Sequence, residues 1–201
     1  MGGLVLPAVL LLSAAPEAAV VTKRLRTGLS SPQASDDLPQ AWAAPIGQAP
    51  TIDGRLDDRA WDATRPVPLG KLERYGEASP PSTVRFLHRG GILYVGATLS
   101  EPYVGKLKRS TAKHDGSAWN DDSVELFLQP RSSDGYYQLV IGASGAVYDR
   151  RGHGDPSEWD SKTKAEVTVG PDGWSLEAAI PMASLGLVGP PTDGGWSRLP
   201  R

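Results

Sequence analysis

The residues best suited to hold a ligand lie in the stretch SAWNDDSVELFL, residues 117–128. Trp119 is flanked by polar residues and precedes a strand-like alternation of apolar and polar side chains. A large ring at this position has no evident core to fill. We therefore expect it to be an exposed, flat platform on which a ligand stacks. The alternative is an aromatic side chain half-buried at the rim of the fold.

Polar side chains near Trp119 would complete such a site. Glu125 alternates out of phase with the apolar residues of its strand, so its carboxylate is expected to point away from the core. Its simplest interpretation is an ordinary solvated strand residue. In the next predicted strand, Tyr136 and Tyr137 are adjacent and must point to opposite faces. One of them is expected in the core, and the other beside Gln138.

Two groups of aspartates offer ligands for a hard cation such as calcium, which prefers several carboxylate and carbonyl oxygens. Asp121 and Asp122 form one group, and Asp53, Asp57 and Asp58 form the other. Neither group has the spacing of an EF-hand loop, and aspartates commonly accept hydrogen bonds from loop amides instead. Calcium is thus an option without assigned ligands, and the sequence requires no cofactor.

Several other kinds of site are excluded. The chain has no cysteine, which rules out disulfides, thiolate metal sites and cysteine nucleophiles. Its three histidines, His88, His114 and His153, are scattered and lack the spacing of a zinc motif. Neither a GxSxG motif nor a glycine-rich phosphate loop is present. The net charge of −2 and the absence of a basic cluster exclude nucleic acid as a partner.

Short strands must position the candidate residues. From residue 50 onward, runs of β-branched and aromatic residues alternate with Gly, Pro and Asp turns. The predicted strands are 82–89 and 92–99, joined by a Gly90-Gly91 hairpin turn, then 123–130, 136–142, 145–150, 164–169 and 174–181. Trp61 and Trp174 are expected in the core. The pattern predicts an all-β antiparallel sandwich or barrel.

The N-terminal part of the chain differs from the rest. Residues 1–21 contain an apolar run too short to span a bilayer, followed by small residues, which is typical of a secretory signal peptide. This predicts a secreted, extracellular or periplasmic protein without stable membrane insertion. Residues 22–49 are rich in Ser, Pro, Ala and Gln and are expected to form a mobile linker. The domain is then 50–201, and it ends where a further strand is expected, which suggests truncation.

Three stretches, in order, resemble the family 9 carbohydrate-binding module (CBM9-like, DOMON-like) superfamily. They are PTIDGRLDDRAWDAT (50–64), WNDDSVELFLQP (119–130) and GWSLEAAIPMASLG (173–186). The resemblance implies a two-sheet β-sandwich of the jelly-roll or immunoglobulin-like type that binds a sugar or glycan without catalysis. It also implies a secreted or envelope protein, often with a linked or associated polysaccharide-degrading domain, and calcium in some members.

By this resemblance, Trp119 corresponds to one ring of an aromatic sugar clamp, and Glu125 to a carboxylate that hydrogen-bonds sugar hydroxyls. The chemistry is sound on general grounds, because an indole is a flat partner for the apolar C–H face of a pyranose. The full predicted carbohydrate-binding set is Trp119, Glu125, Gln138, Tyr137, Asn120 and Trp159.

Departures from the family pattern leave alternatives open. Val140 and Gly142 stand where the family often has Arg and Asn, so the sandwich could be a structural accessory domain with a decayed sugar site. Related sandwiches hold a b-type haem, for which Met182 and His114 would be the axial ligands. An enzyme is not expected, because the nearest pair of carboxylates is three residues apart and would point to opposite faces of a strand.

Overall fold

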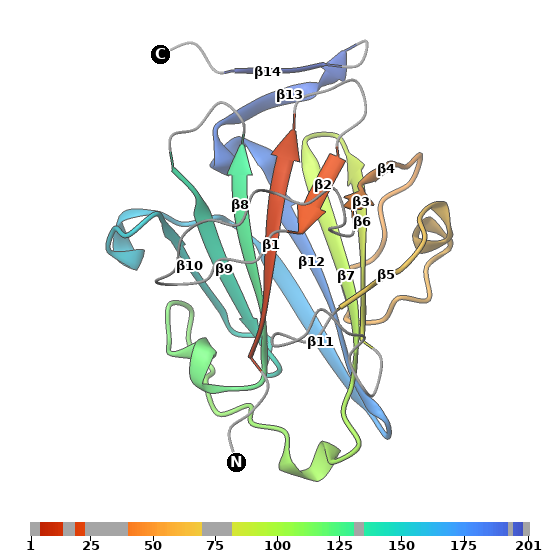
Figure 1. Cartoon of the computed structure of the whole chain (residues 1–201), viewed down its shortest axis with the longest axis vertical. Helices are drawn as coiled ribbons and strands as arrows, with labels where there is room; N and C mark the ends of the chain where they lie inside the picture. Colours follow the sequence, from red (N-terminus) through yellow and green to blue (C-terminus); the bar gives the residue numbers. More distant parts are fainter. Residues whose placement is uncertain are drawn as a thin grey trace, which may run out of the picture.

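The predicted all-β fold is confirmed. The computed structural model describes residues 5–13, 19–22, 40–69, 82–130, 135–192 and 195–198, with side chains for 43–69, 82–129 and 135–187. These residues form two sheets packed face to face, linked by loops and short 3-10 helices (Figure 1). Within them, no helix has the length and apolar character needed to cross a membrane.

The two sheets have the following strand orders. Sheet A runs β10 (Val147–Arg151), β9 (Tyr137–Gly142), β8 (Ser123–Pro130), β1 (Val5–Ser13), β2 (Ala19–Thr22) and β3 (Gln40–Trp42). Sheet B runs β11 (Lys164–Gly170), β12 (Gly173–Pro181), β7 (Ile92–Ser100), β6 (Thr83–Arg89) and β4 (Ala44–Pro45), with β5 (Val67–Pro68) also paired to β6. β13 (Leu187–Thr192) pairs with β14 (Gly195–Arg198). The 3-10 helices are η1 (Arg59–Ala63), η2 (Val104–Lys106), η3 (Ala118–Asn120), η4 (Pro156–Glu158) and η5 (Met182–Leu185).

The N-terminal segments contribute strands at both sheets. β1 runs parallel to β8, and β4 runs parallel to β6, so the sandwich is not purely antiparallel as predicted. β1 lies within the predicted signal peptide, and β3 and β4 lie within the predicted linker. Backbone pairing does not test cleavage, so the signal peptide and the domain boundaries stay predictions. Of the predicted linker, residues 23–39 lie outside the described residues.

Apolar side chains at alternate positions of the strands fill the core between the two sheets. The inward residues of sheet A are Val124, Leu126, Leu128, Tyr137, Leu139, Ile141 and Val147. Those of sheet B are Val84, Phe86, Leu93, Val95, Ala97, Leu99, Trp174, Leu176, Ala178 and Ile180. Because successive side chains of a strand point to opposite faces, Glu125 and Phe127 of β8, Gln138 and Val140 of β9, and Tyr148 and Arg150 of β10 lie on the outer face of sheet A.

The outer face of sheet B is covered by the chain itself. Segment 43–63 crosses it, and η1 places Trp61 against Leu87 and Tyr94 in a second buried cluster. Trp61 is fully buried, and Trp174 is buried between the sheets, which confirms both core predictions. The outer face of sheet A is therefore the face on which to look for a binding site.

A buried carboxylate fixes this covering segment to β12. Glu177 is fully buried, and its Oε1 accepts a hydrogen bond from the indole Nε1–H of Trp61 at 2.7 Å. Its Oε2 accepts the backbone N–H groups of Asp53 and Gly54, both at 3.0 Å. Burial raises the pKa of Glu177, and these donors oppose the rise. The motif TIDG…AW thus folds around one acceptor.

Substitution of Gly54 by alanine is expected to destabilise the fold by about 2 kcal/mol, because two costs add. Gly54 has a φ of +82°, and a Cβ there would lie 2.6 Å from the backbone carbon of Val167. Urea unfolding followed by tryptophan fluorescence measures the loss. Gly47→Ala is the control, because a Cβ at Gly47 meets nothing within 4 Å. Equal effects of the two substitutions would contradict this explanation.

Candidate functional site

Trp119 lies in η3, beside the outer face of sheet A. Its side chain is 42% exposed, which confirms the predicted exposure. The ring meets that of Tyr148 edge-on, with centroids 4.7 Å apart and an interplanar angle of 76°. Tyr148 is itself buried in a small cluster with Ala118 and Val140. The indole is therefore supported by a packed neighbour while much of its surface stays open to a ligand.

A row of three polar side chains crosses the same face from β8 to β10. The Gln138 amide donates to Glu125 Oε1, and Arg150 Nε donates to Gln138 Oε1 at 2.5 Å. The cross-strand register explains the row. Gln138 is paired directly with Arg150, and Glu125 is paired with Val140, the next residue of β9 on the same face, so that Glu125 and Gln138 meet diagonally. Burial raises the pKa of Glu125, while the Gln138 hydrogen bond and the Arg150 charge oppose the rise.

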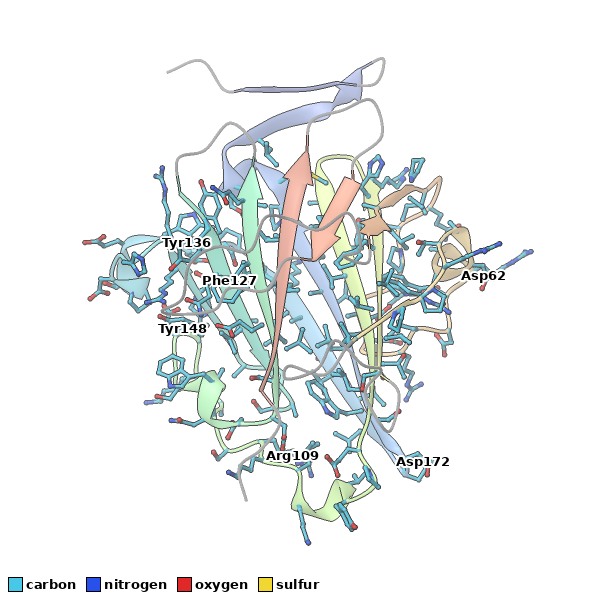
Figure 2. The ribbon with its side chains drawn as sticks, in the orientation of Figure 1. Asp62, Arg109, Phe127, Tyr136, Tyr148 and Asp172 are labelled. Atoms are coloured by element: carbon cyan, nitrogen blue, oxygen red, sulfur yellow. The ribbon has the colours of Figure 1, made fainter. Side chains whose placement is uncertain are left out.

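Further aromatic side chains lie on the other side of this row. The rings of Phe127 and Tyr136 are 5.7 Å apart, and Tyr136 meets His153 edge-on at 5.7 Å. Figure 2 shows Phe127, Tyr136 and Tyr148 grouped over β8, β9 and β10. The outer face of sheet A thus combines exposed or half-buried rings with a carboxylate, an amide and a guanidinium. We call this surface the β8–β10 face.

Two predicted site residues do not lie on this face. Tyr137 is buried in the core between the sheets, and the ring of Trp159 lies 4.8 Å from it. The indole N–H of Trp159 donates to the backbone oxygen of Ser184 at 3.1 Å. Strand parity is the reason, since Tyr137 alternates with Gln138. The assignment is therefore corrected, because Tyr136 lines the face instead. Asn120 is exposed and directly follows Trp119.

Asp121 and Asp122 hold the loop that leads to Trp119. Asp121 is buried and accepts hydrogen bonds from the Ser110 hydroxyl and the Thr111 N–H, both at 2.7 Å. Burial by itself would raise the pKa of Asp121, but these hydrogen bonds outweigh it and lower the pKa. Asp122 accepts the N–H of Lys108 at 2.7 Å. Both carboxylates therefore stabilise loop backbone.

The second aspartate group is used in the same way. Asp53 accepts the N–H of Arg55 at 2.9 Å, and Asp58 accepts the N–H of Thr51 at 2.7 Å. Across the part of the chain that the structure describes, the one cluster of three metal-ligating side chains is formed by other residues. Calcium at either aspartate group stays a prediction to which the geometry adds no support.

Tyr148 and Arg150 are, like Phe127, residues of this face that the predicted carbohydrate-binding set did not include. Both belong to β10, which forms a hairpin with β9. The predicted strands 136–142 and 145–150 would pair Gln138 with Asp149 across a two-residue turn, whereas the observed register pairs it with Arg150. This shift of one residue places Tyr148 and Arg150 on the same face as Gln138, which the predicted turn did not indicate. Val140 stands where the family often has an arginine, and it is buried in a cluster with Tyr148. The guanidinium of this face is instead that of Arg150, from the neighbouring strand β10.

Comparisons with known proteins agree with this architecture. The family model "Carbohydrate family 9 binding domain-like" matches residues 52–196. A solved candidate carbohydrate-binding protein from Bacteroides uniformis ATCC 8492 shares 16% identity and a TM-score of 0.52, over 71% of this chain and 72% of that chain. This similarity supports the shared fold.

Two further solved structures are a family 9 carbohydrate-binding module from Caldicellulosiruptor kristjanssonii, with glucose and with cellotriose. Identities are 18% and 19%, and TM-scores are 0.46 and 0.43. The match covers 69% of this chain in both cases, and 66% and 65% of those chains, slightly less than two thirds. No curated protein matches the chain. Because the family model spans most of its length, the chain belongs to the carbohydrate family 9 binding domain-like family.

Proposed function

We propose that this domain binds a sugar or glycan, without catalysis, on the β8–β10 face. The observation that supports this most is an exposed indole, Trp119, next to a polar row that ends in a carboxylate and a guanidinium. A pyranose ring can stack its apolar face on the indole. Its hydroxyls can then form charge-assisted hydrogen bonds with Glu125 and Arg150. Family membership supports the same class of ligand.

The three polar side chains of the row retain hydrogen-bond donors and acceptors that their contacts with one another do not use. A carboxylate offers about four lone-pair sites and a guanidinium five N–H donors, whereas the contacts with Gln138 use one site of each. The row therefore holds Glu125 and Arg150 in fixed positions and leaves further acceptors and donors for sugar hydroxyls. Such preorganisation lowers the entropy lost on binding.

The proposal is a binding domain and not an enzyme. Glycoside hydrolysis generally needs two carboxylates that flank the scissile bond. Glu125 lies on the β8–β10 face, whereas Asp122 is held in the preceding loop by the N–H of Lys108. If the predicted signal peptide is functional, the domain would be exported from the cytoplasm, and we propose that it acts there beside a polysaccharide-degrading domain.

A structural accessory role without sugar binding is the second candidate. It is favoured by Val140, which is buried beneath Tyr148, and by Gly142, which offers no side chain to a ligand. The haem alternative has less support, because Met182 is buried in the core while the imidazole of His114 faces carboxylates.

Titration with soluble mono- and oligosaccharides, including glucose and cellotriose, tests the proposal. Calorimetry should give dissociation constants of about micromolar to millimolar, with a change in tryptophan fluorescence. If no sugar in the panel binds, the accessory role is the correct one.

Sugar affinity should also depend on pH through Glu125. Because burial raises the pKa of Glu125 above its usual 4.5, the carboxylate takes up a proton at a higher pH than an exposed glutamate. Affinity should be constant near neutral pH and fall as the pH decreases through this raised pKa. Glu125→Gln should bind roughly tenfold more weakly and lose the dependence. Calorimetry between about pH 4 and 7.5 measures both, and a flat profile for the unaltered protein would exclude this role.

A further inference from the structure

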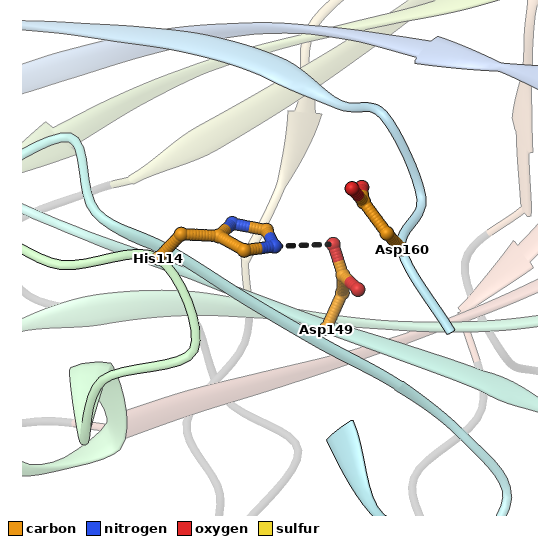
Figure 3. Close-up of side chains that lie close together, drawn as sticks. All are labelled: His114, Asp149 and Asp160. Carbon is orange, nitrogen blue, oxygen red and sulfur yellow. Dashed lines mark ion pairs between the residues drawn. The ribbon is translucent and has the colours of Figure 1, made fainter. Parts of the chain in front are cut away.

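A second polar cluster lies on the inward side of β10, away from the β8–β10 face. His114 comes from the loop between η2 and η3, Asp149 from β10, and Asp160 follows η4 (Figure 3). One ring nitrogen and one oxygen from each carboxylate all lie within 4.8 Å of one another. His114 Nε2 is 3.9 Å from Asp149 Oδ2. Asp149 alternates with Tyr148 and Arg150, so the cluster and the sugar face are on opposite sides of one strand.

Asp149 is a buried carboxylate with one of its two oxygens unpaired. The residue is fully buried, and its Oδ2 accepts hydrogen bonds from the hydroxyl and the N–H of Ser161 at 2.6 and 3.3 Å. Its Oδ1 is buried without a hydrogen-bond partner. A buried carboxylate oxygen left unpaired is costly unless a proton or a cation compensates it.

Two other charged groups border the cluster. Asp115 Oδ2 lies 3.6 Å from His114 Nε2, and Asp115 Oδ1 accepts the N–H of Asp149 at 3.4 Å. Lys162 Nζ lies 2.5 Å from Asp160 Oδ2, with both side chains largely exposed. The ammonium group is thus a cation that an incoming metal ion can displace into solvent. Among the described residues other than glycine, Asp115 and Lys162 are the two with positive φ, both 57°.

The cluster is open to solvent, and its donors favour a particular class of metal. Solvent reaches it through His114 and Asp160, which are exposed, whereas Asp149 is buried. A depression of about 480 Å³ beside the cluster is lined by His114 but by neither of the two aspartates. One imidazole nitrogen with two carboxylate oxygens suits zinc and similar transition metals, whereas calcium takes oxygen ligands. Tetrahedral coordination needs ligand atoms about 3.4 Å apart. His114 and Asp160 are exposed, so small side-chain rotations towards the fixed Asp149 would close the cluster.

We propose that His114, Asp149 and Asp160 bind one divalent transition-metal ion, with zinc as the representative ion. The ion would join three segments that are distant in sequence: the loop before η3, strand β10 and the turn after η4. Its role would be structural, since it would supply the counter-charge of Asp149 and fix the loop that continues into Trp119. The site is independent of the sugar proposal, because its ligands lie on the other side of β10.

Zinc titration of tag-free, chelator-treated protein tests this site. Calorimetry and equilibrium dialysis should show one zinc ion bound per chain. Saturating zinc should raise Tm by on the order of 5 °C. His114→Ala and Asp160→Ala should each weaken zinc binding at least about tenfold and abolish the Tm shift. Both residues are exposed, so neither substitution should prevent folding.

The matched control is His153→Ala, which removes an exposed histidine outside the cluster and should leave zinc binding unchanged. The proposal is overturned if the protein binds no zinc, or if all three substitutions weaken binding equally. Calcium chloride is the second probe, and calcium binding as tight as zinc binding would overturn the assignment to a transition metal.

Discussion

Trp119→Ala is expected to weaken sugar binding roughly 10- to 100-fold, while the fold is retained. The substitution removes the stacking surface, which is 42% exposed and supported by Tyr148. Because the side chain is not part of the buried core, its loss should change the free energy of unfolding by less than about 1 kcal/mol. Calorimetric titration with the tightest-binding sugar of the panel measures the first effect, and urea unfolding measures the second.

The control for this substitution is Tyr103→Ala. Tyr103 is the other exposed large aromatic side chain of the described residues, at 64% exposure, and the ammonium of Lys106 lies over its ring. Since Tyr103 is outside the β8–β10 face, its removal should leave sugar affinity unchanged. Sugar affinity that survives Trp119→Ala, or falls equally in Tyr103→Ala, would show that the indole is not the platform.

Glu177→Ala is expected to lower the free energy of unfolding by about 3 kcal/mol or more. The substitution leaves three donors without their acceptor: the Trp61 indole N–H and the Gly54 N–H, which are buried, and the Asp53 N–H, which is partly buried. It also opens a cavity between β12 and the covering segment. Glu177→Gln should cost less, roughly 1–2 kcal/mol, because the amide keeps one acceptor oxygen. Urea unfolding at neutral pH gives both values.

Glu166→Ala is the matched control, since Glu166 is directly paired with Glu177 across β11 and β12 but is exposed. Its substitution should change stability by less than about 0.5 kcal/mol. If both substitutions had the same small effect, Glu177 would not be the residue that fixes segment 43–63 to sheet B.

Local signals predicted most of the strands. Gly90 and Gly91 have positive φ and join β6 to β7 as expected for a two-residue hairpin. Strands with strict alternation, such as β8, appear within a residue or so of their predicted limits. The parallel pairings of β1 and β4 were missed because they join segments far apart in sequence, with no turn between them to reveal the partner.

The site was predicted less completely. The main error, the choice of Tyr137 in place of Tyr136, concerns which alternate residues of β9 point outward. Polar neighbours correctly indicated that Trp119 is exposed, but the choice between Tyr136 and Tyr137 depends on which face of β9 meets sheet B. The ring of Trp159 packs against that of Tyr137, and the spacing of residues in the sequence does not predict this contact. No sequence motif links His114, Asp149 and Asp160. They come from two loops and strand β10, which lie together only in the folded chain.

The most direct test of the sugar proposal is a titration followed by the indole N–H signals in ¹H–¹⁵N NMR spectra. The Trp119 signal, identified by its absence in Trp119→Ala, should move progressively as sugar is added. The signals of Trp61 and Trp174, which are buried, should stay in place. If the Trp119 signal is unmoved by every sugar of the panel at millimolar concentrations, or only the buried indoles respond, the β8–β10 face is not a carbohydrate-binding surface.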